Sequence, residues 1–173
     1  QFRRWAHWMP ETSRFTALEP ALAFLADAPW PLVSKADVGA SSVNVRILAG
    51  RAEAENHLRL LFGEGIPAHH GAGSKAPNTP QKGYALLQRF IPHRITWRVN
   101  AIGNARAIFM RYCYADRPVA QTGNVEPVMK LTDQHRSLLE FANKVFADIG
   151  TKWCARDILQ DGAAWKMLET SLA

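Results

Sequence analysis

Two carboxylates near the end of the chain have the residue type and spacing of a metal site. Asp157 and Glu169 lie in two apolar segments that flank a turn signal. If residues 161–163 form the loop of a hairpin, position 157 lies opposite position 167. Glu169 is then the diagonal neighbour of Asp157 on the same face, roughly 7–8 Å away at the backbone. Carboxylates this close repel unless a cation joins them, and their hard oxygens suit Mg²⁺. Ion pairs with arginines are the alternative.

Two arginines form a second pair, on a hairpin predicted around Gly103-Asn104. A two-residue turn there places Arg98 opposite position 109, so that Arg111 becomes its diagonal neighbour on the same face. Like charges this close are unfavourable unless an anion lies between them, so the pair predicts an anion site. Arginines on an open, solvated face are the alternative.

Lys35 ends a predicted strand and precedes a turn of small residues that contains Gly39, Ser41 and Ser42. A lysine in this position can meet a phosphate group as a point charge. The turn can offer backbone N–H groups and serine hydroxyls to the phosphate oxygens. An exposed lysine before an ordinary turn fits the same residues.

The apolar segment that ends in Gln88, Arg89, Phe90 and Ile91 has a different potential use. Where such a strand runs into a loop, its backbone donors and acceptors can pair with the edge of an adenine ring. Taken alone, the segment also fits a buried strand without any ligand.

Hydrophobic periodicity and turn signals indicate the elements that must position these residues. Helices are predicted over about residues 16–26, 51–62 and 132–149, the last of them ending at Gly150. Strands are predicted over residues 31–35, 43–48, 84–91, 95–102, 105–114, 152–159 and 164–170. Residues 63–83 and 116–130 are predicted to be irregular. The order of elements describes two β-rich halves, each with helix, and therefore an α+β fold.

The composition excludes several classes of protein. The chain has 173 residues, of which 47% are hydrophobic and 21% charged, as in globular proteins. It has no run of about 18 apolar residues, so no membrane span is expected. Its cysteines, Cys113 and Cys154, are too few for a disulfide scaffold and lack zinc-site spacing. A cytoplasmic location is therefore expected.

The net charge of +6 favours anionic partners. It does not choose among nucleotides, nucleic acid and acidic substrates. The basic residues are dispersed and no recognition-helix pattern is present, so a basic nucleic-acid-binding domain is the weaker alternative. The chain begins with Gln1 and stops after a strand-like run, which suggests a piece of a longer protein.

Taken in chain order, these residues resemble the ATP-grasp family of ATP-dependent carboxylate ligases. The relevant branch includes peptide-tail glutamate ligases and the glutathione and D-alanine ligases. The resemblance covers nearly the whole chain, from Pro-Leu-Val-Ser-Lys through Leu-Gln-Arg-Phe-Ile to Asp-Ile and Leu-Glu-Thr-Ser. It implies two α+β subdomains with mainly antiparallel sheets that clamp the nucleotide. A lead-in of residues 1–11 would precede a smaller subdomain, 12–91, and a larger one, 92–173, with the metal site.

The resemblance also implies roles for the residues named above. ATP would be contacted by Lys35 at its phosphates, by the loop with Gly39, Ser41 and Ser42, and at adenine by Gln88, Arg89, Phe90 and Ile91. Arg111 would lie near the transferred phosphate and Arg98 near the acceptor or ATP. Asp157, Glu169 and Ser171 would hold Mg²⁺, or Mn²⁺ in its place. The γ-phosphoryl group would pass to a substrate carboxylate, and an amine or a thiol would attack the resulting acyl phosphate.

Two departures from the family pattern support an alternative. Ser171 stands where the family usually has Asn, and a hydroxyl is a weaker magnesium ligand than an amide oxygen. The phosphate loop contains only Gly39, where the family is richer in glycine. The family's N-terminal, substrate-binding subdomain also has no counterpart here. The alternative is an ATP-grasp-like domain that binds nucleotide or serves as a scaffold without catalysing a reaction.

Overall fold

The computed structural model describes residues 5–36, 45–67, 80–113, 124–150 and 153–172. The chain divides into two compact units. One unit comprises Glu11–Phe90, and the other comprises Gln1–Pro10 together with Ile91–Ala173. No helix in the described ranges is both long enough and apolar enough to cross a membrane.

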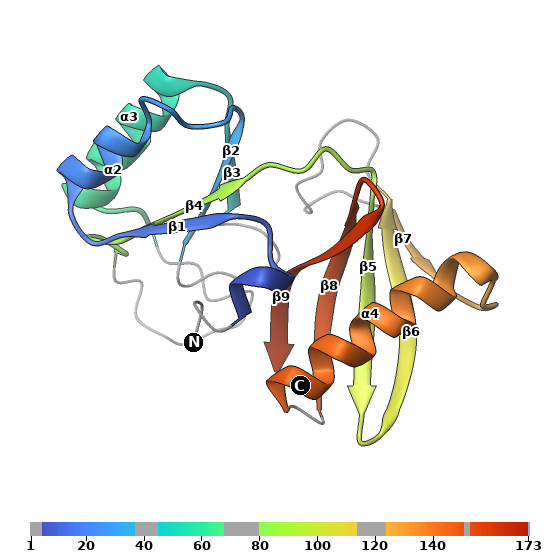
Figure 1. Ribbon diagram of the computed structural model, residues 1–173. Helices are drawn as coiled ribbons and strands as arrows, with labels where there is room; N and C mark the ends of the chain where they lie inside the picture. The colour runs from blue at the N-terminus through green and yellow to red at the C-terminus, as the bar shows by residue number, and fades with distance from the viewer. Residues whose placement is uncertain (1–4, 37–44, 68–79, 114–123, 151–152, 173) are drawn as a thin grey trace. The chain divides into compact units, whose positions relative to one another are not determined.

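The unit Glu11–Phe90 is an antiparallel sheet with two helices against one face (Figure 1). Its strands are β1 (Thr12–Phe15), β2 (Leu32–Lys35), β3 (Val45–Leu48) and β4 (Ala85–Arg89), in the order β1-β4-β2-β3. The helices are α2 (Leu18–Phe24) and α3 (Arg51–Phe62). Every neighbouring pair of strands is antiparallel, as predicted.

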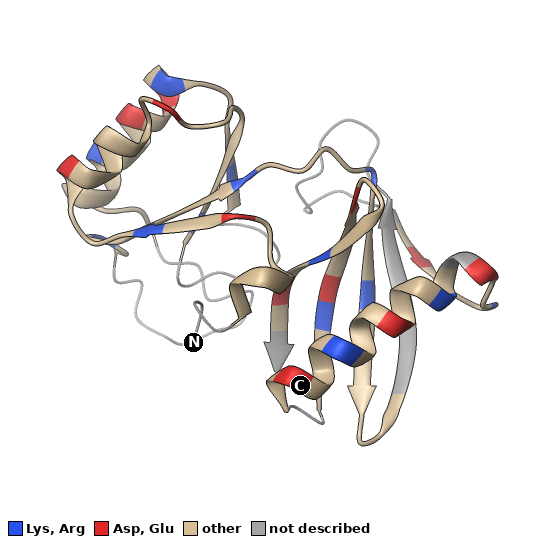
Figure 2. Ribbon diagram, viewed as in Figure 1, with Lys and Arg blue, Asp and Glu red and all other residues tan. Residues whose placement is uncertain are grey.

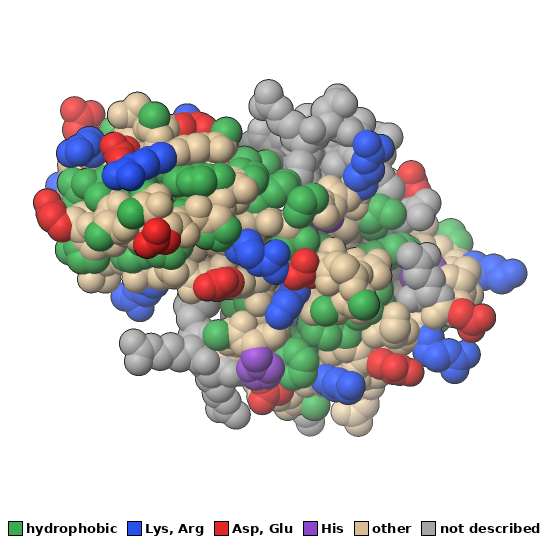
Figure 3. Space-filling view, turned by 45° about the horizontal axis from the view of Figure 1, so that its top comes forward, with side chains coloured by type: hydrophobic (Ala, Val, Ile, Leu, Met, Phe, Trp, Pro, Cys, Tyr) green, Lys and Arg blue, Asp and Glu red, His purple; other side chains and the backbone are tan. Residues whose placement is uncertain are grey.

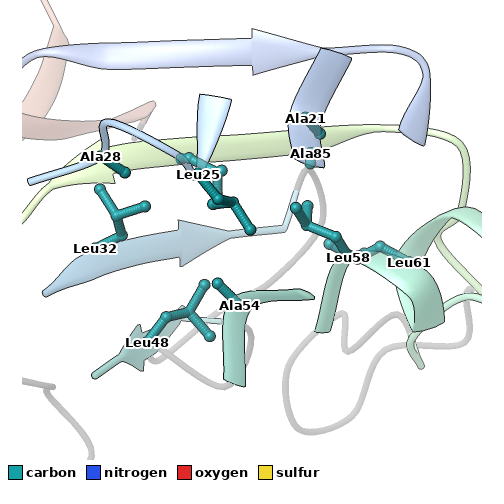
Figure 4. Packing of buried hydrophobic residues seen from close by; sticks show 10 residues of the cluster. Ala21, Leu25, Ala28, Leu32, Leu48, Ala54, Leu58, Leu61 and Ala85 are labelled. Atoms are coloured by element: carbon teal, nitrogen blue, oxygen red, sulfur yellow. The ribbon is translucent and has the colours of Figure 1, made fainter. Parts of the chain in front are cut away.

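Apolar side chains of α2 and α3 meet one face of this sheet (Figure 4). Leu25, which directly follows α2, and Leu58 of α3 pack with Leu32 and Leu48 from the strands, and each is at most 1% exposed. Full burial of a leucine side chain contributes about 1.5–3 kcal/mol relative to exposure. Packing between sheet and helices is therefore the main source of stability in this unit.

An acidic residue in the first turn of α3 joins this helix to the end of β3. The carboxylate of Glu53 accepts hydrogen bonds from the backbone N–H of Ala49 at 3.0 Å and from the guanidinium of Arg46 at 3.1 and 3.2 Å. The backbone hydrogen bond, followed by the arginine, lowers the pKa of Glu53. These contacts fix the entry of the chain into α3.

The second unit has a five-stranded antiparallel sheet and one long helix. Its strands are β5 (Ile95–Ile102), β6 (Ala105–Cys113), β7 (Asn124–Pro127), β8 (Trp153–Asp161) and β9 (Ala164–Leu172), in the order β7-β6-β5-β8-β9. Helix α4 (Asp133–Ile149) lies across one face of the sheet (Figure 1). Gly150 ends it in the left-handed conformation, at φ 74°.

The core of this unit lies between α4 and the sheet. Leu138 and Phe146 from α4 pack with Trp97 and Val99 of β5 and with Ile158 of β8. Because side chains alternate along a strand, these contacts also identify the residues on the opposite face. On β5 that face carries the even-numbered positions from 96 to 102, and on β8 it carries the odd-numbered ones.

A short 3-10 helix, η1 (Ala6–Trp8), belongs to this second unit. The indole N–H of Trp8 donates to the Asp148 carboxylate at 2.8 Å, and its ring meets Phe141 edge-on, with ring centroids 5.5 Å apart. Lys166 of β9 donates to the His7 carbonyl at 3.2 Å. Residues just before the first unit are thereby bound to α4 and β9.

The structure confirms the α+β class, the helices predicted over 51–62 and 132–149, and both hairpins of the second unit. Two strands were not predicted. β1 and β7 have four residues each and lie at sheet edges; no element was predicted over 12–15, and 116–130 was expected to be irregular. Pairing with β4 and β6, rather than local propensity, makes them strands.

Candidate functional site

Lys35 lies on the face of its sheet that points away from the helices. Its neighbour Ser34 is buried on the helix side, where its hydroxyl is hydrogen-bonded to His57 of α3 at 2.8 Å. Alternation along β2 places Lys35 on the other face, opposite Leu86 of β4. The lysine proposed for phosphate contact is therefore outside the hydrophobic core. The loop residues Gly39, Ser41 and Ser42 lie outside the described residues.

The segment predicted to contact adenine is bound to β1. The Gln88 side chain is 2% exposed and donates from Nε2 to Thr12 Oγ1 at 2.8 Å. The Arg89 N–H donates to the Glu11 carbonyl at 2.8 Å. The Ile91 carbonyl accepts a hydrogen bond from His93 Nδ1 at 2.6 Å.

The two predicted metal carboxylates lie directly opposite each other, across β8 and β9. Asp157 pairs with Glu169, whereas the sequence predicted a diagonal relationship. Two features cause the difference. The turn has two residues, since Asp161 pairs with Ala164, and Leu168 forms a β-bulge that shifts the register. Opposite residues have Cα atoms about 4.5–5.5 Å apart, so the carboxylates are closer than predicted.

Arg98 extends this pair into a row across three strands. It lies opposite Asp157 on β5, and Figure 2 shows the basic position on β5 beside acidic positions on β8 and β9. Its Nε donates to Asp157 Oδ1 and one terminal nitrogen donates to Oδ2, both at 2.7 Å. The same terminal nitrogen is 3.8 Å from Glu169 Oε1. The guanidinium thus occupies the position of a cation beside both carboxylates.

The exposure of these three side chains indicates how strong the ion pair is. The side chains of Asp157 and Arg98 are 12% and 27% exposed, while that of Glu169 is 54% exposed. A bidentate pair that is mostly removed from water is stronger than an exposed one. The ion-pair alternative is therefore realised at Asp157, and more weakly at Glu169.

The predicted pairing of Arg98 with Arg111 is wrong. A bulge in β6 falls between the pairs of Arg98 and Val99, so that Arg98 lies opposite Met110 and Arg111 lies opposite Trp97. The predicted register, with position 98 opposite position 109, is therefore off by one residue on β6. On the other side of β6, the backbone of Arg111 pairs with Glu126.

The two carboxylates fit a divalent cation by their chemistry. An ionised carboxylate has about four lone-pair sites, so Asp157 retains acceptor capacity beyond its two hydrogen bonds to Arg98. Among the described residues, however, no three Asp, Glu, His or Cys side chains are close enough to hold a metal. Further oxygens would be needed. Ser171, the third predicted ligand, pairs with Ala155 in the adjacent row.

Two polar residues of this face were missed in the sequence. Thr96 and Asn100 alternate with Arg98 on β5, and their side-chain oxygens, Oγ1 and Oδ1, are buried without a hydrogen-bond partner. Alternation of polar with apolar residues over positions 96–101 was the signal that could have identified them.

Charged side chains of both signs are otherwise mixed in both units. Figure 2 shows Lys and Arg interspersed with Asp and Glu along the described helices and strands, without a continuous basic stripe. The surface in Figure 3 has the same mixture, with basic and acidic groups beside one another among apolar patches.

Comparison with known proteins reveals the fold. No family model matches the chain, and no curated protein matches it by sequence. Among solved structures, it is similar to a RimK domain ATP-grasp protein from Sphaerobacter thermophilus, with a TM-score of 0.62 and 17% identity over 99% of this chain and 55% of that one. For D-alanine–D-alanine ligase from Bacillus anthracis, the TM-score is 0.67 and the identity 14%, over 99% of this chain and 53% of that one. For phosphoribosylamine–glycine ligase from Thermotoga maritima, the TM-score is 0.69 and the identity 17%, over 98% of this chain and 45% of that one.

At these identities the similarity concerns the fold. The chain spans about half the length of the solved structures that it matches. The similarity nevertheless extends over 98–99% of this chain. The expectation drawn from the order of its residues is confirmed, and the chain has the ATP-grasp fold.

Proposed function

We propose that this chain is the nucleotide- and metal-binding part of an ATP-dependent ligase. Such an enzyme activates a substrate carboxylate as an acyl phosphate, which an amine then attacks to form a C–N bond. The observation that carries the proposal is the row Arg98–Asp157–Glu169, on the sheet face opposite α4 in a chain with the ATP-grasp fold. The similar solved structures, which include two amino-acid ligases, support the reaction class.

In this proposal, Asp157 and Glu169 hold Mg²⁺, or Mn²⁺ in its place. An ion held there would supply positive charge against the phosphate oxygens during phosphoryl transfer. Asp157 is fixed for this role from one side, because two hydrogen bonds from Arg98 determine the plane of its carboxylate. Glu169 is more exposed and can adjust to the ion. Ser171 is a third candidate ligand.

The cationic residues bind and orient phosphate groups. Lys35 contacts the phosphates of ATP as a point charge. Arg98 has donors that phosphate oxygens can share with Asp157, and Arg111 is proposed to lie near the transferred phosphoryl group. Preorganised positive charge of this kind stabilises the transition state of phosphoryl transfer without a covalent nucleophile.

An alternative is a domain that binds nucleotide without catalysing a reaction. The Arg98–Asp157 ion pair favours this alternative, because a guanidinium already satisfies the carboxylate that a catalytic metal would need. The two functions differ in their products. A ligase releases ADP when a suitable carboxylate is present, whereas a binding domain retains ATP unchanged.

Isothermal titration with a non-hydrolysable ATP analogue, with and without Mg²⁺, tests the proposal. We expect metal-dependent binding that the double variant Asp157→Asn, Glu169→Gln abolishes. Glu140→Gln is the matched control, since Glu140 is exposed on α4 and far in sequence from the site. Absence of binding by the unaltered chain at millimolar analogue would overturn the proposal. If the chain does bind, an assay with ATP, candidate carboxylates and hydroxylamine, which traps acyl phosphates, distinguishes the two functions. A ligase releases ADP in this assay, and a binding domain does not.

A further inference from the structure

Three polar side chains lie in line on β5, on the face opposite α4. Thr96, Arg98 and Asn100 alternate with Trp97 and Val99, which are buried against the helix. The Arg98 side chain donates two hydrogen bonds to the carboxylate of Asp157 on this face. The two residues that flank it present oxygens with no hydrogen bond.

The register places Asn100 next to the carboxylate pair. Asn100 lies opposite Ala155 of β8, which in turn lies opposite Ser171 of β9. This row is adjacent to the row Arg98–Asp157–Glu169, so Asn100 is a diagonal neighbour of Asp157 on the same face. Between Asn100 and β9, the only side chain of the row is the methyl group of Ala155. No long side chain of β8 therefore lies in the row between Asn100 and β9.

The state of the Asn100 amide indicates that something else contacts it. Its Oδ1 is buried and accepts no hydrogen bond. Burying a carbonyl oxygen without a partner is unfavourable, and native proteins rarely leave one so. An ordered water, an ion or a bound ligand resolves such a case.

Amide oxygens are ligands of the kind that Mg²⁺ and Mn²⁺ accept. Diagonal neighbours are roughly 7–8 Å apart at the backbone, a gap that long side chains can reach across. Oxygens bound to one Mg²⁺ at about 2.1 Å span that gap. An uncharged oxygen also adds a ligand without adding a third negative charge to the site.

We infer that Asn100 supplies its Oδ1 as a further oxygen ligand to the cation held by Asp157 and Glu169. This inference rests on the proposed function, and it adds a residue of β5 to a site otherwise built from β8 and β9. It accounts for the orphaned amide oxygen. It also gives the site an amide ligand where Ser171 offers only a hydroxyl.

Binding of Mn²⁺, followed by electron paramagnetic resonance in the presence of a non-hydrolysable ATP analogue, tests the inference. Asn100→Leu keeps the side-chain size and removes the oxygen, and we expect the dissociation constant for Mn²⁺ to rise at least about tenfold. Asn100→Asp restores an oxygen and should bind Mn²⁺ at least as tightly as the unaltered chain. Asn143→Leu, at an exposed position of α4, is the control and should change nothing.

A second measurement distinguishes a ligand from a structural residue. Because the metal-free chain contains an orphaned oxygen at Asn100, the Asn100→Leu variant should melt no lower than the unaltered chain without metal. If this variant binds Mn²⁺ as the unaltered chain does, the inference is wrong and the proposed function stands. A lower melting temperature without metal would assign Asn100 a structural role and overturn the inference. If the unaltered chain binds neither Mn²⁺ nor the analogue, the proposed function fails and the inference fails with it.

Discussion

Arg98 and Asp157 meet in a two-point contact across β5 and β8, with both hydrogen bonds at 2.7 Å. Neither side chain is more than 27% exposed, so water screens the pair only in part. A divalent cation must therefore share the Asp157 oxygens with a guanidinium that is already in place. The phosphates of a nucleotide would offer that guanidinium a second anionic partner. We therefore expect metal and nucleotide to bind together.

Arg98→Met tests this dependence. Without the guanidinium, Asp157 has no competing cation, and we expect Mn²⁺ to bind about tenfold more tightly in the absence of nucleotide, a change of about 1.4 kcal/mol. Electron paramagnetic resonance of free Mn²⁺ gives this affinity directly. Arg136→Met, at an exposed position of α4, is the control. Unchanged or weaker Mn²⁺ binding by Arg98→Met would contradict the expectation.

Lys35→Met should weaken binding of the ATP analogue. A charge-assisted contact to phosphate contributes about 1.5–3 kcal/mol, which corresponds to a dissociation constant about 10–100-fold higher. Isothermal titration in the presence of Mg²⁺ measures the change. Lys82→Met removes the same charge at an exposed position of the same unit and should leave binding unaltered. Equal losses in the two variants would mean that net charge, and not a contact of Lys35, determines affinity.

His57 should make the stability of the chain depend on pH. Burial, followed by the charge of Arg46 on β3, lowers the pKa of His57 below its usual 6.5, while Glu53 on α3 opposes the shift. Below pH 6.5 the unfolded chain binds a proton that the folded chain excludes, so the free energy of unfolding falls as the solution is acidified.

Urea unfolding at pH 7.5 and pH 5.5 measures this effect. His57→Gln cannot titrate and can keep a hydrogen bond to Ser34, so the loss of stability on acidification should be smaller in this variant. Parallel losses in the two proteins would show that other groups are responsible.

Leu58→Ala should destabilise the unit Glu11–Phe90 by about 2–5 kcal/mol, because it creates a cavity between α3 and the sheet. Leu60→Ala is the matched control on the same helix. Leu60 is 41% exposed, and its truncation should change stability by only about 0.5 kcal/mol. Urea unfolding of both variants gives the comparison, and similar losses would contradict the packing described here.

The elements with strong local signals were predictable from sequence. Apolar residues at helical spacing, followed by Gly150, predicted α4 almost to the residue, and the dipeptide Gly103-Asn104 predicted the hairpin of β5 and β6. The order of the candidate residues along the chain predicted the fold. These features depend on neighbours in sequence, where pattern and structure coincide.

The registers within the sheets were not predictable. Bulges at Leu168 and beside Arg98 have no distinctive sequence, because packing of whole strands against α4 determines where an extra residue is accommodated. The bulge in β6 shifted the register of Arg111 relative to Arg98 by one residue, and the bulge in β9 placed Asp157 directly opposite Glu169. Alternation could have placed Asn100 on the polar face of β5, but its position beside Asp157 could not be predicted, since that relationship exists only once β5 and β8 pair.

The bulge at Leu168 also affects how relatives of this chain should be sought. Ile158 pairs with Met167, so an unbulged hairpin with the same turn would bring position 168, and not 169, opposite Asp157. The same pair of acids can therefore be encoded at two spacings that differ by one residue. A search pattern with a fixed interval between Asp and Glu would miss one of the two groups, whereas a pattern that permits both intervals would recover proteins with the same pair.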